Sequence, residues 1–491
     1  DTLDIYFAAF RIPDFLFNLL VVGALSASFI PLFTRYLNRG DEAGAWRHTN
    51  NVLNIMTLAF AVLLVFGYIF ATPLAALVAP GFDATKQAGV ASMSRVMFAA
   101  QLLLAISVVY GSALQAMKRF VLYSLAPIFY NVGIIAGALL FVPILGSIGL
   151  AWGVVLGAFL HLIIQFVGVN SLGYKYRPVF DPKDEHVRHT FLQMIPRMLG
   201  LAVNQINFLA MTVIASTLTA GSVTLLQFAY NLNFFAIGAV AVPYSIAAYP
   251  TFCELLDRKD KTDFVKSFSS TIRQILFFMI PATILFILLR AQVVRVVLGA
   301  GMFGWDETIT TANTLGIFVL SLVAQSIVYI LVRAYFAKGD TVTPLAMGLV
   351  SAVINILAGL YFTKMFGVLG FGIAYSLSAI VQVSLLWVPL RMSIGNLDEY
   401  KIAKSMLKLS LAGLACAAIT QMAKTVVVQW IPLETFLAVL AQGLFAGLLG
   451  LAVYALVAWL LKSEEIRDFA SGLKRKLLKK AKSPEAVVGM E

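Results

Sequence analysis

Four polar side chains accompany the first apolar stretch of the sequence, residues 5–37. They are Asp4, Arg11, Asp14 and Asn18. Steps of seven, three and four residues place all four on one broad face of a helix. An ionisable group at membrane depth costs about 3 kcal/mol or more, so such groups usually face a bundle interior or a water-filled cavity. The spacing predicts a helix, kinked at Pro13, that lines a cavity and meets a charged substrate. An interfacial position for Asp4 and Arg11 is the alternative.

Three further arginines, Arg197, Arg273 and Arg333, lie within or at the ends of apolar stretches. Arg197 shares its predicted helix with Asn204 and Asn207, which together would make a wet face. Because arginine binds phosphate through two parallel hydrogen bonds, a cavity with several arginines favours an anionic, phosphate-bearing substrate. Alternatively, Arg197 and Arg333 extend to the membrane surface along their aliphatic stems.

The composition indicates a polytopic helical membrane protein, because 60% of its 491 residues are hydrophobic and only 12% are charged. The sequence contains no motif for nucleotide binding, for nucleophilic catalysis or for a metal, so we expect a transporter without a cofactor rather than an enzyme. A membrane-embedded transferase would need clustered acidic residues for metal or base chemistry, and the apolar stretches carry no such pair. Nucleic acid is not an expected partner.

Apolar helical runs predict thirteen membrane spans. They fall at 5–37, 50–79, 90–117, 121–143, 148–170, 190–217, 221–254, 268–299, 308–337, 343–365, 369–390, 403–429 and 433–461. Alternate connections are rich in lysine and arginine, which places them and the C-terminus in the cytoplasm. With thirteen spans Asp1 then lies outside, and we expect one more helix to precede it.

Short motifs recur at a nearly constant offset. Ala113–Ala116 corresponds to Ala334–Ala337, and Gly146-x-x-Gly149 corresponds to Gly367-x-x-Gly370. Such a parallel repeat predicts two similar lobes with a substrate site between them. The expected domains are an N-lobe (1–170), a cytoplasmic linker (171–189), a C-lobe (190–392), a C-terminal helix pair (393–461) and a basic amphipathic cytoplasmic tail (462–491).

Several motifs, in order along nearly the whole chain, resemble the MurJ (MviN) family of flippases for the lipid-linked peptidoglycan precursor. They are LDIYFAAFRIP at 3–13, APGF at 79–82, LQAMKRF at 114–120, GLAWGVVLG at 149–157, LGLAVNQIN at 199–207 and RAYFAKGDTVTP at 333–344. The resemblance implies fourteen helices in the multidrug/oligosaccharidyl-lipid/polysaccharide exporter fold. Two six-helix lobes would enclose a central cavity, and the last two helices would form a groove for the lipid tail. Thirteen spans would then leave the family's first helix missing from this chain.

The resemblance also implies roles for individual residues. The family's essential carboxylate falls on Asp4 and an essential arginine falls on Arg273. Relatives have a cavity arginine where Asn18 stands, an Asp-Arg pair where Tyr230 and Asn231 stand, and Asp or Asn where Met211 stands, which puts a sodium site there in doubt. We hypothesise that Arg197 replaces the lost cavity charge.

The expected function is movement of an undecaprenyl-pyrophosphate-linked sugar-peptide (lipid II) across the bacterial inner membrane by alternating access. The expected substrate-binding residues are Asp4, Arg11, Asn18, Arg197 and Arg273. Asp14, Asn204, Asn207 and Arg333 are candidates for substrate contact or gating. Alternatives are a flippase of the same fold for another polysaccharide lipid and a non-transporting scaffold of wall synthesis. Cell-wall synthesis proteins are candidate partners.

Overall fold

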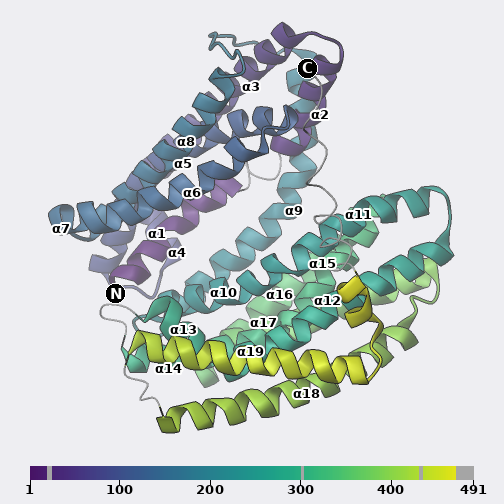
Figure 1. Cartoon of the computed structure of the whole chain (residues 1–491). Coiled ribbons are helices and arrows are strands. Elements are labelled where there is room, and N and C mark those ends of the chain that lie inside the picture. Colours follow the sequence, from purple (N-terminus) through teal and green to yellow (C-terminus); the bar gives the residue numbers. More distant parts are fainter. Residues whose placement is uncertain (19–24, 300–303, 431–434, 472–491) are drawn as a thin grey trace, which may run out of the picture. The chain divides into compact units, whose positions relative to one another are not determined.

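A computed structural model of the chain describes residues 1–18, 25–299, 304–430 and 435–471 (Figure 1). Within these ranges the regular elements are all helical, which confirms the expected all-α class. The chain forms two compact units, Asp1–Thr224 and Leu225–Glu491, and each is described by itself.

The first unit is built from nine α-helices and two short irregular helices within its described residues. They are α1 (Thr2–Phe17), α2 (Leu25–Asn38), α3 (Glu42–Ile69), α4 (Ala71–Val78), α5 (Ala84–Ala116), α6 (Phe120–Ala136), the π-helix η2 (Gly137–Phe141), α7 (Val142–Leu145), the 3₁₀ turn η3 (Gly146–Ile148), α8 (Gly149–Asn170) and α9 (Glu185–Ser216). The expected boundary at the 171–189 linker differs from this division, because α9 packs on α1 to α4 and so belongs with the first unit.

The helix that follows α9 begins just before the second unit, and the remaining helices of the chain lie within the second unit. They are α10 (Ser222–Ala239), α11 (Ala241–Asp257), α12 (Lys261–Leu288), α13 (Arg290–Leu298), α14 (Trp305–Phe318), η4 (Val319–Ser321), α15 (Leu322–Ala337), α16 (Val342–Phe366), α17 (Leu369–Ile394), α18 (Glu399–Trp430) and α19 (Phe436–Leu460). The last two helices, α18 and α19, run side by side and pack on α12 and α13 (Figure 1).

Ten helical runs among the described residues are long and apolar enough to cross a membrane, so the expected count of thirteen is not confirmed. The predicted span 5–37 includes residues 19–24, which lie outside the described residues. The predicted span 190–217 contributes only a shorter apolar helix, Ala202–Ser216. The predicted spans 121–143 and 148–170 form one run, Phe120–Asn170, which turns back at Gly146 so that α6 packs along α8.

The repeated Gly-x-x-Gly motif has the same local structure in both units. Gly146 and Gly367 end a helix with φ of +69° and +56°, a conformation that glycine adopts without strain. Gly149 and Gly370 begin the next helix, where an added Cβ would lie 2.5 Å from the backbone of Phe141 and 2.4 Å from that of Phe362, respectively. The motif therefore encodes the tight turn of a helical hairpin, α6–α8 in one unit and α16–α17 in the other.

Four glycines bring α6 and its π-helical extension into close contact with α8. Gly133 and Gly137 face Gly157 and Gly153, so that a Cβ on Gly133 would lie 2.3 Å from the Cα of Gly157. A Cβ on Gly137 would lie 2.1 Å from the Cα of Gly153. Small residues four apart allow this backbone approach in membrane helices, where packing rather than water exclusion drives association.

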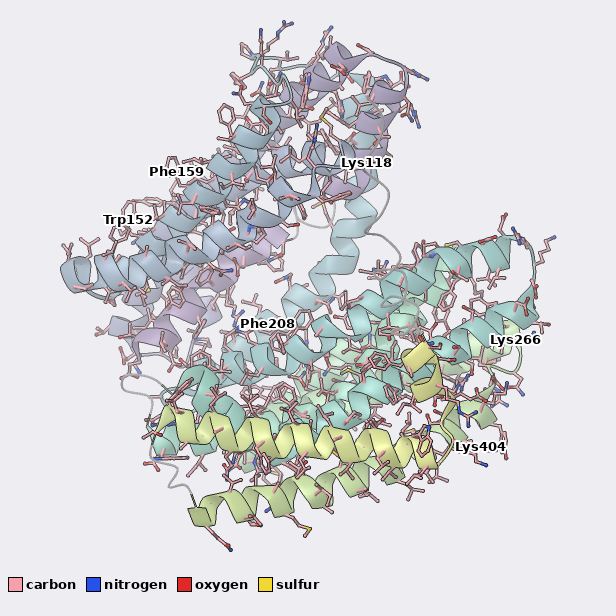
Figure 2. The ribbon with its side chains drawn as sticks, in the orientation of Figure 1. Lys118, Trp152, Phe159, Phe208, Lys266 and Lys404 are labelled. Atoms are coloured by element: carbon pink, nitrogen blue, oxygen red, sulfur yellow. The ribbon has the colours of Figure 1, made fainter. Side chains whose placement is uncertain are left out.

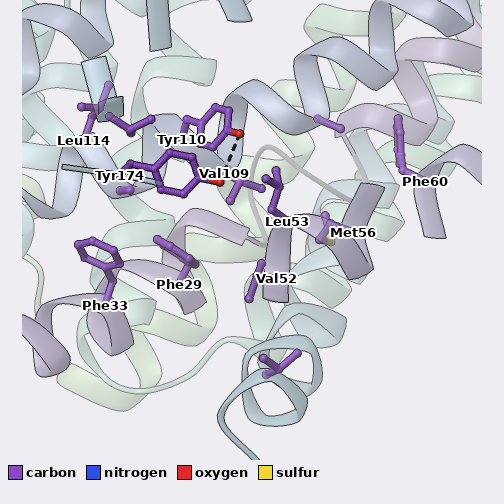
Figure 3. Packing of buried hydrophobic residues seen from close by; sticks show 14 of the residues in the cluster. Phe29, Phe33, Val52, Leu53, Met56, Phe60, Val109, Tyr110, Leu114 and Tyr174 are labelled. Atoms are coloured by element: carbon purple, nitrogen blue, oxygen red, sulfur yellow. Dashed lines mark hydrogen bonds between the residues drawn. The ribbon is translucent and has the colours of Figure 1, made fainter. Parts of the chain in front are cut away.

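The core of the first unit lies between α2, α3 and α5, around Phe29, Phe33, Phe60 and Tyr110 (Figure 3). The linker after α8 is anchored on this core: the Tyr174 hydroxyl donates to Asn50 Oδ1 over 2.6 Å. Asn51 accepts from the backbone N–H of Asp181 and donates to its carbonyl, at 2.7 and 2.9 Å. Asparagine side chains of α3 therefore fix the linker to this helix. They bind linker backbone groups that have no regular backbone partner.

Many large apolar side chains remain exposed on the helices. Trp152 and Phe159 on α8 project from the outer side of the first unit with exposed fractions of 46% and 48% (Figure 2). Large exposed apolar surfaces mark contact with a membrane or a partner. Together with the ten long apolar runs, this surface identifies a multi-pass membrane protein.

Candidate functional site

Asp4 is 1% exposed and caps a helix that begins more than two hundred residues later in the sequence. Its Oδ2 accepts from the backbone N–H of Gly221 at 2.5 Å. Its Oδ1 accepts from the backbone N–H and the hydroxyl of Thr224 at 2.8 and 2.6 Å. These groups belong to the first turn of α10 and the residue before it, where backbone N–H groups lack helical partners and the helix dipole favours an anion.

The structure therefore provides a physical reason for a carboxylate at position 4. Both oxygens of Asp4 are occupied by donors of the same unit, and Gly221 adopts φ +90°, which directs its N–H toward α1. In this structure Asp4 ties the start of α1 to the start of α10.

The other charged groups of α1 point to different neighbours. The Arg11 guanidinium lies over the ring of Phe208 on α9, 4.2 Å from its centroid; Figure 2 labels Phe208 on that helix. Asp14 Oδ1 accepts from Nε2 of Gln101 on α5 at 2.9 Å. The one broad face predicted for α1 is thus divided between α5, α9 and α10.

Asn18 ends α1 by donating its side-chain amide to the carbonyl of Asp14 at 2.9 Å. On α9, Asn204 is exposed and Asn207 is half-buried. The backbone of Arg197 is helical, but its side chain lies outside the described residues. Because α1 and α9 are in contact, Arg11 and the polar residues of α9 belong to neighbouring helices of the same unit.

Arg273 lies in the second unit, near the middle of α12, and is bound by two carboxylates. Its Nη1 donates to Glu464 and to Glu465, both at 2.8 Å. Glu465 is 4% exposed and also accepts from the Ser405 hydroxyl at 2.8 Å. Burial raises the pKa of Glu465, but the hydrogen bonds from Ser463 and Ser405 and the charge of Arg273 outweigh burial and lower it below its usual range.

Arg333 and Asp340, two residues of the motif at 333–344, contact neighbouring groups within the second unit. The Arg333 guanidinium lies 5.5 Å from the ring centroid of Tyr249. Asp340, just before α16, accepts from the backbone N–H groups of Val342 and Thr343 in its first turn, at 3.1 and 2.9 Å. Burial raises the pKa of Asp340, but the hydrogen bonds from Thr343 and Val342 outweigh it and lower this pKa.

Sequence reasoning missed Gln101 and Glu465. Gln101 is an uncharged residue in an apolar helix, and Glu465 stands in a charged segment that is typical of a solvated tail. In the folded chain Gln101 is 1% exposed and Glu465 is 4% exposed. Because buried polar groups are hydrogen-bonded, this burial shows that both residues are partners of other polar groups. Within the described ranges, no group of three or more His, Cys, Asp and Glu side chains could hold a metal ion.

A family model and several known proteins match this chain over most of its length. The model of the family "Lipid II flippase MurJ" matches residues 1–441. A probable lipid II flippase MurJ of Haemophilus influenzae is 26% identical over 457 residues, which cover 89% of each chain. That of Rhizobium tropici is 25% identical over 501 residues, covering 99% of this chain and 93% of the relative.

Solved structures agree on the fold. A lipid II flippase MurJ in an inward closed conformation superimposes with a TM-score of 0.77 at 22% identity, covering 96% of this chain and 93% of the other. An inward-facing multidrug transporter of the MATE family matches with a TM-score of 0.70 at 16% identity, covering 81% and 91%. Because the family model spans most of the sequence, this chain belongs to the lipid II flippase MurJ family.

Proposed function

We propose that this flippase carries an undecaprenyl-pyrophosphate-linked sugar-peptide from the inner to the outer leaflet of the bacterial inner membrane by alternating access. The observation that carries the proposal is the family match over residues 1–441, and the relatives' names specify lipid II. A ligand drives such a change only through different affinities for the two conformations. Charged groups that the headgroup contacts in one conformation would supply such a difference.

We propose that Arg11 is the first of these groups. Its guanidinium carbon lies over the Phe208 ring, 4.2 Å from the centroid. A guanidinium carries its N–H groups in a planar fork that suits bidentate phosphate binding. The neighbouring helix α9 carries Arg197, Asn204 and Asn207, which would extend the contact toward the sugar. Asp4 would act indirectly, by holding α1 in place through its bonds to the start of α10.

A cytoplasmic C-terminus is part of the proposal. Connections rich in basic residues come together at one end of the second unit: Lys261 Nζ donates to the carbonyl of Ser393 at 3.4 Å, and Lys338 contacts the hydroxyl of the same residue. Lys266 and Lys404 lie toward this end of α12 and α18 (Figure 2). An accumulation of positive charge at one end of a helix bundle favours the cytoplasmic side.

The test is translocation of a labelled undecaprenyl-pyrophosphate disaccharide-peptide in proteoliposomes. We expect transport by the wild type and a loss of about tenfold or more in Arg11→Ala. Arg95→Ala is the matched control, because Arg95 contacts Tyr68 and Thr72 at the exposed surface of the same unit. Equal rates in Arg11→Ala and Arg95→Ala would exclude Arg11 from the site. Absence of transport by folded wild-type protein would contradict the proposed substrate.

A further inference from the structure

Two basic side chains, Arg290 and Lys424, lie at the end of the second unit opposite to Lys266 and Lys404 (Figures 1 and 2). Arg290 begins α13, directly after α12, and Lys424 lies in the last two turns of α18. With a cytoplasmic C-terminus, as proposed, this is the outer end of the unit. Because the positive-inside tendency does not account for cations there, these two require another explanation.

Arg290 and Lys424 meet at the last turn of α12. Nη1 of Arg290 donates to the carbonyl of Ile287 at 2.8 Å, and Nζ of Lys424 donates to the carbonyl of the next residue, Leu288, at 2.7 Å. The charge of Arg290 is close enough to act on Lys424. Carbonyls at a helix C-terminus carry partial negative charge, so each cation makes one favourable contact with α12.

Neighbouring helices hold both residues in place. Nε of Arg290 donates to Oδ1 of Asn313 on α14 at 3.3 Å. Nε2 of Gln442 on α19 donates to the carbonyl of Lys424 at 3.0 Å, and its Oε1 accepts from Nε2 of Gln292 at 2.8 Å. Because Gln442 is fully buried, this amide chain fixes α18 to α19 and to α13. The fold therefore determines the separation of the two cations.

The contacts with α12 use only part of the donors of Arg290 and Lys424. Among the described residues Nη2 of Arg290 has no hydrogen-bond partner, and Nζ of Lys424 makes one of its three possible bonds. Neither side chain forms an ion pair in that part of the chain. Like charges repel more strongly in a membrane than in water. Two half-buried cations with unused donors therefore favour a bound anion.

The surroundings of the pair favour a lipid as the source of this anion. Val428, one turn further along the same face of α18, is 49% exposed. Trp305 at the start of α14 is 48% exposed, and the Arg295 guanidinium lies 5.2 Å from its ring centroid. Exposed tryptophan is typical of the membrane interface, the level of the lipid headgroups. An anion at this level has apolar protein surface beside it for its acyl chains.

We propose that Arg290 and Lys424 bind the phosphate group of a lipid headgroup. The phosphate accepts from Nη2 of Arg290 and from Nζ of Lys424, offsets their mutual repulsion and ties α13 to α18. This headgroup contact is distinct from the groove for a lipid tail that was expected at the last two helices. Only its position in the outer leaflet rests on the proposed function and its cytoplasmic C-terminus.

The test measures lipid binding to the full chain in detergent by native mass spectrometry. The probes are phosphatidylglycerol, undecaprenyl diphosphate, diacylglycerol, which lacks a phosphate, and inorganic phosphate. We expect the wild type to bind the phosphate-bearing lipids about fivefold or more tightly than diacylglycerol, and Arg290→Gln and Lys424→Gln each to lose about fivefold. The double variant should bind them no better than diacylglycerol. Lys424→Arg keeps the charge and should bind as the wild type does.

A control and a second measurement separate lipid binding from capping of α12. Lys364→Gln is the matched control, because Lys364 is an exposed lysine in the last turn of α16 of the same unit. It should bind lipid as the wild type does. Phosphatidylglycerol should raise the melting temperature of the wild type but not that of the double variant. A capping role alone would lower the melting temperature of the double variant equally with and without lipid.

Equal affinity of the wild type and the double variant for both phosphate-bearing lipids would overturn the site. Equal affinity of the wild type for phosphatidylglycerol, undecaprenyl diphosphate and diacylglycerol would overturn the role of the phosphate, and binding of inorganic phosphate alone would overturn the role of the lipid. An equal loss in Lys364→Gln would reduce the effect to general surface charge.

The two lipids distinguish the source of the phosphate. Tighter binding of undecaprenyl diphosphate would make the transported lipid the occupant, and tighter binding of phosphatidylglycerol would make it a membrane phospholipid; both support the site. Wild-type protein that binds lipid through Arg290 and Lys424 but transports nothing would contradict the proposed function alone.

Discussion

Oδ1 of Asp4 accepts two hydrogen bonds from Thr224, one from its backbone N–H and one from its hydroxyl, across a sequence separation of 220 residues. The contact joins the first turn of the first described helix to the first turn of α10. A residue expected to contact substrate thus has a complete set of partners within its own unit.

Asp4→Ala is expected to lower the free energy of unfolding by about 1–3 kcal/mol, because it removes a buried cap and leaves the Thr224 groups unpartnered. Thermal unfolding in detergent measures the change. Asp1→Ala is the control, since the Asp1 side chain is 64% exposed in its ion pair with Lys86. An unchanged melting temperature together with lost transport would assign Asp4 to the substrate instead.

Gly137→Ala is expected to destabilise the first unit by about 1–3 kcal/mol, because its new Cβ would lie 2.1 Å from the Cα of Gly153 and the two helices would have to separate. Gly238→Ala on α10 serves for comparison, since its Cβ would meet only the Phe234 ring, at 3.9 Å. The melting temperatures of both variants, measured by thermal unfolding, test this expectation. Equal melting temperatures would show that α6 and α8 do not need glycine to approach.

Asn51→Ala is expected to release the linker from α3, because the Asn51 amide is bound to both the N–H and the carbonyl of Asp181. Limited proteolysis should then cleave within 175–183 several-fold faster than in the wild type. Asn131→Ala removes a local bond to Pro127 on α6 and should leave the cleavage rate unchanged. If Asn51→Ala were cleaved no faster, the linker would be held by other contacts.

The segment after α19, residues 463–471, is expected to loosen from α12 in acid. The pKa of Glu465 is lowered in the fold, so its ionised form contributes stability above the ordinary glutamate pKa of 4.5. This contribution is lost as the pH falls below that value and through the lowered pKa. Proteolysis within 463–471 by an acid-stable protease should therefore increase as the pH falls below about 4.5. Glu465→Gln should remove this pH dependence, and a wild-type profile in that variant would refute the assignment.

The sequence alone predicted the all-helical class, the apolar runs, the repeated Gly-x-x-Gly motif and the family, because each depends on residues close together along the chain. Helical periodicity and turn glycines act over a few residues, and family motifs are contiguous. The break predicted between residues 143 and 148 falls where the chain turns back at Gly146 and α6 packs along α8.

Tertiary structure decided which group each charged side chain meets. Periodicity placed Asp4, Arg11 and Asp14 on one face of α1, but their partners lie on α10, α9 and α5, far along the chain. The same holds for Arg273, whose carboxylates follow α19 in a segment that by composition is typical of a solvated tail. A local pattern specifies that a buried charge needs a partner, whereas the packing of distant helices determines which residue that partner is.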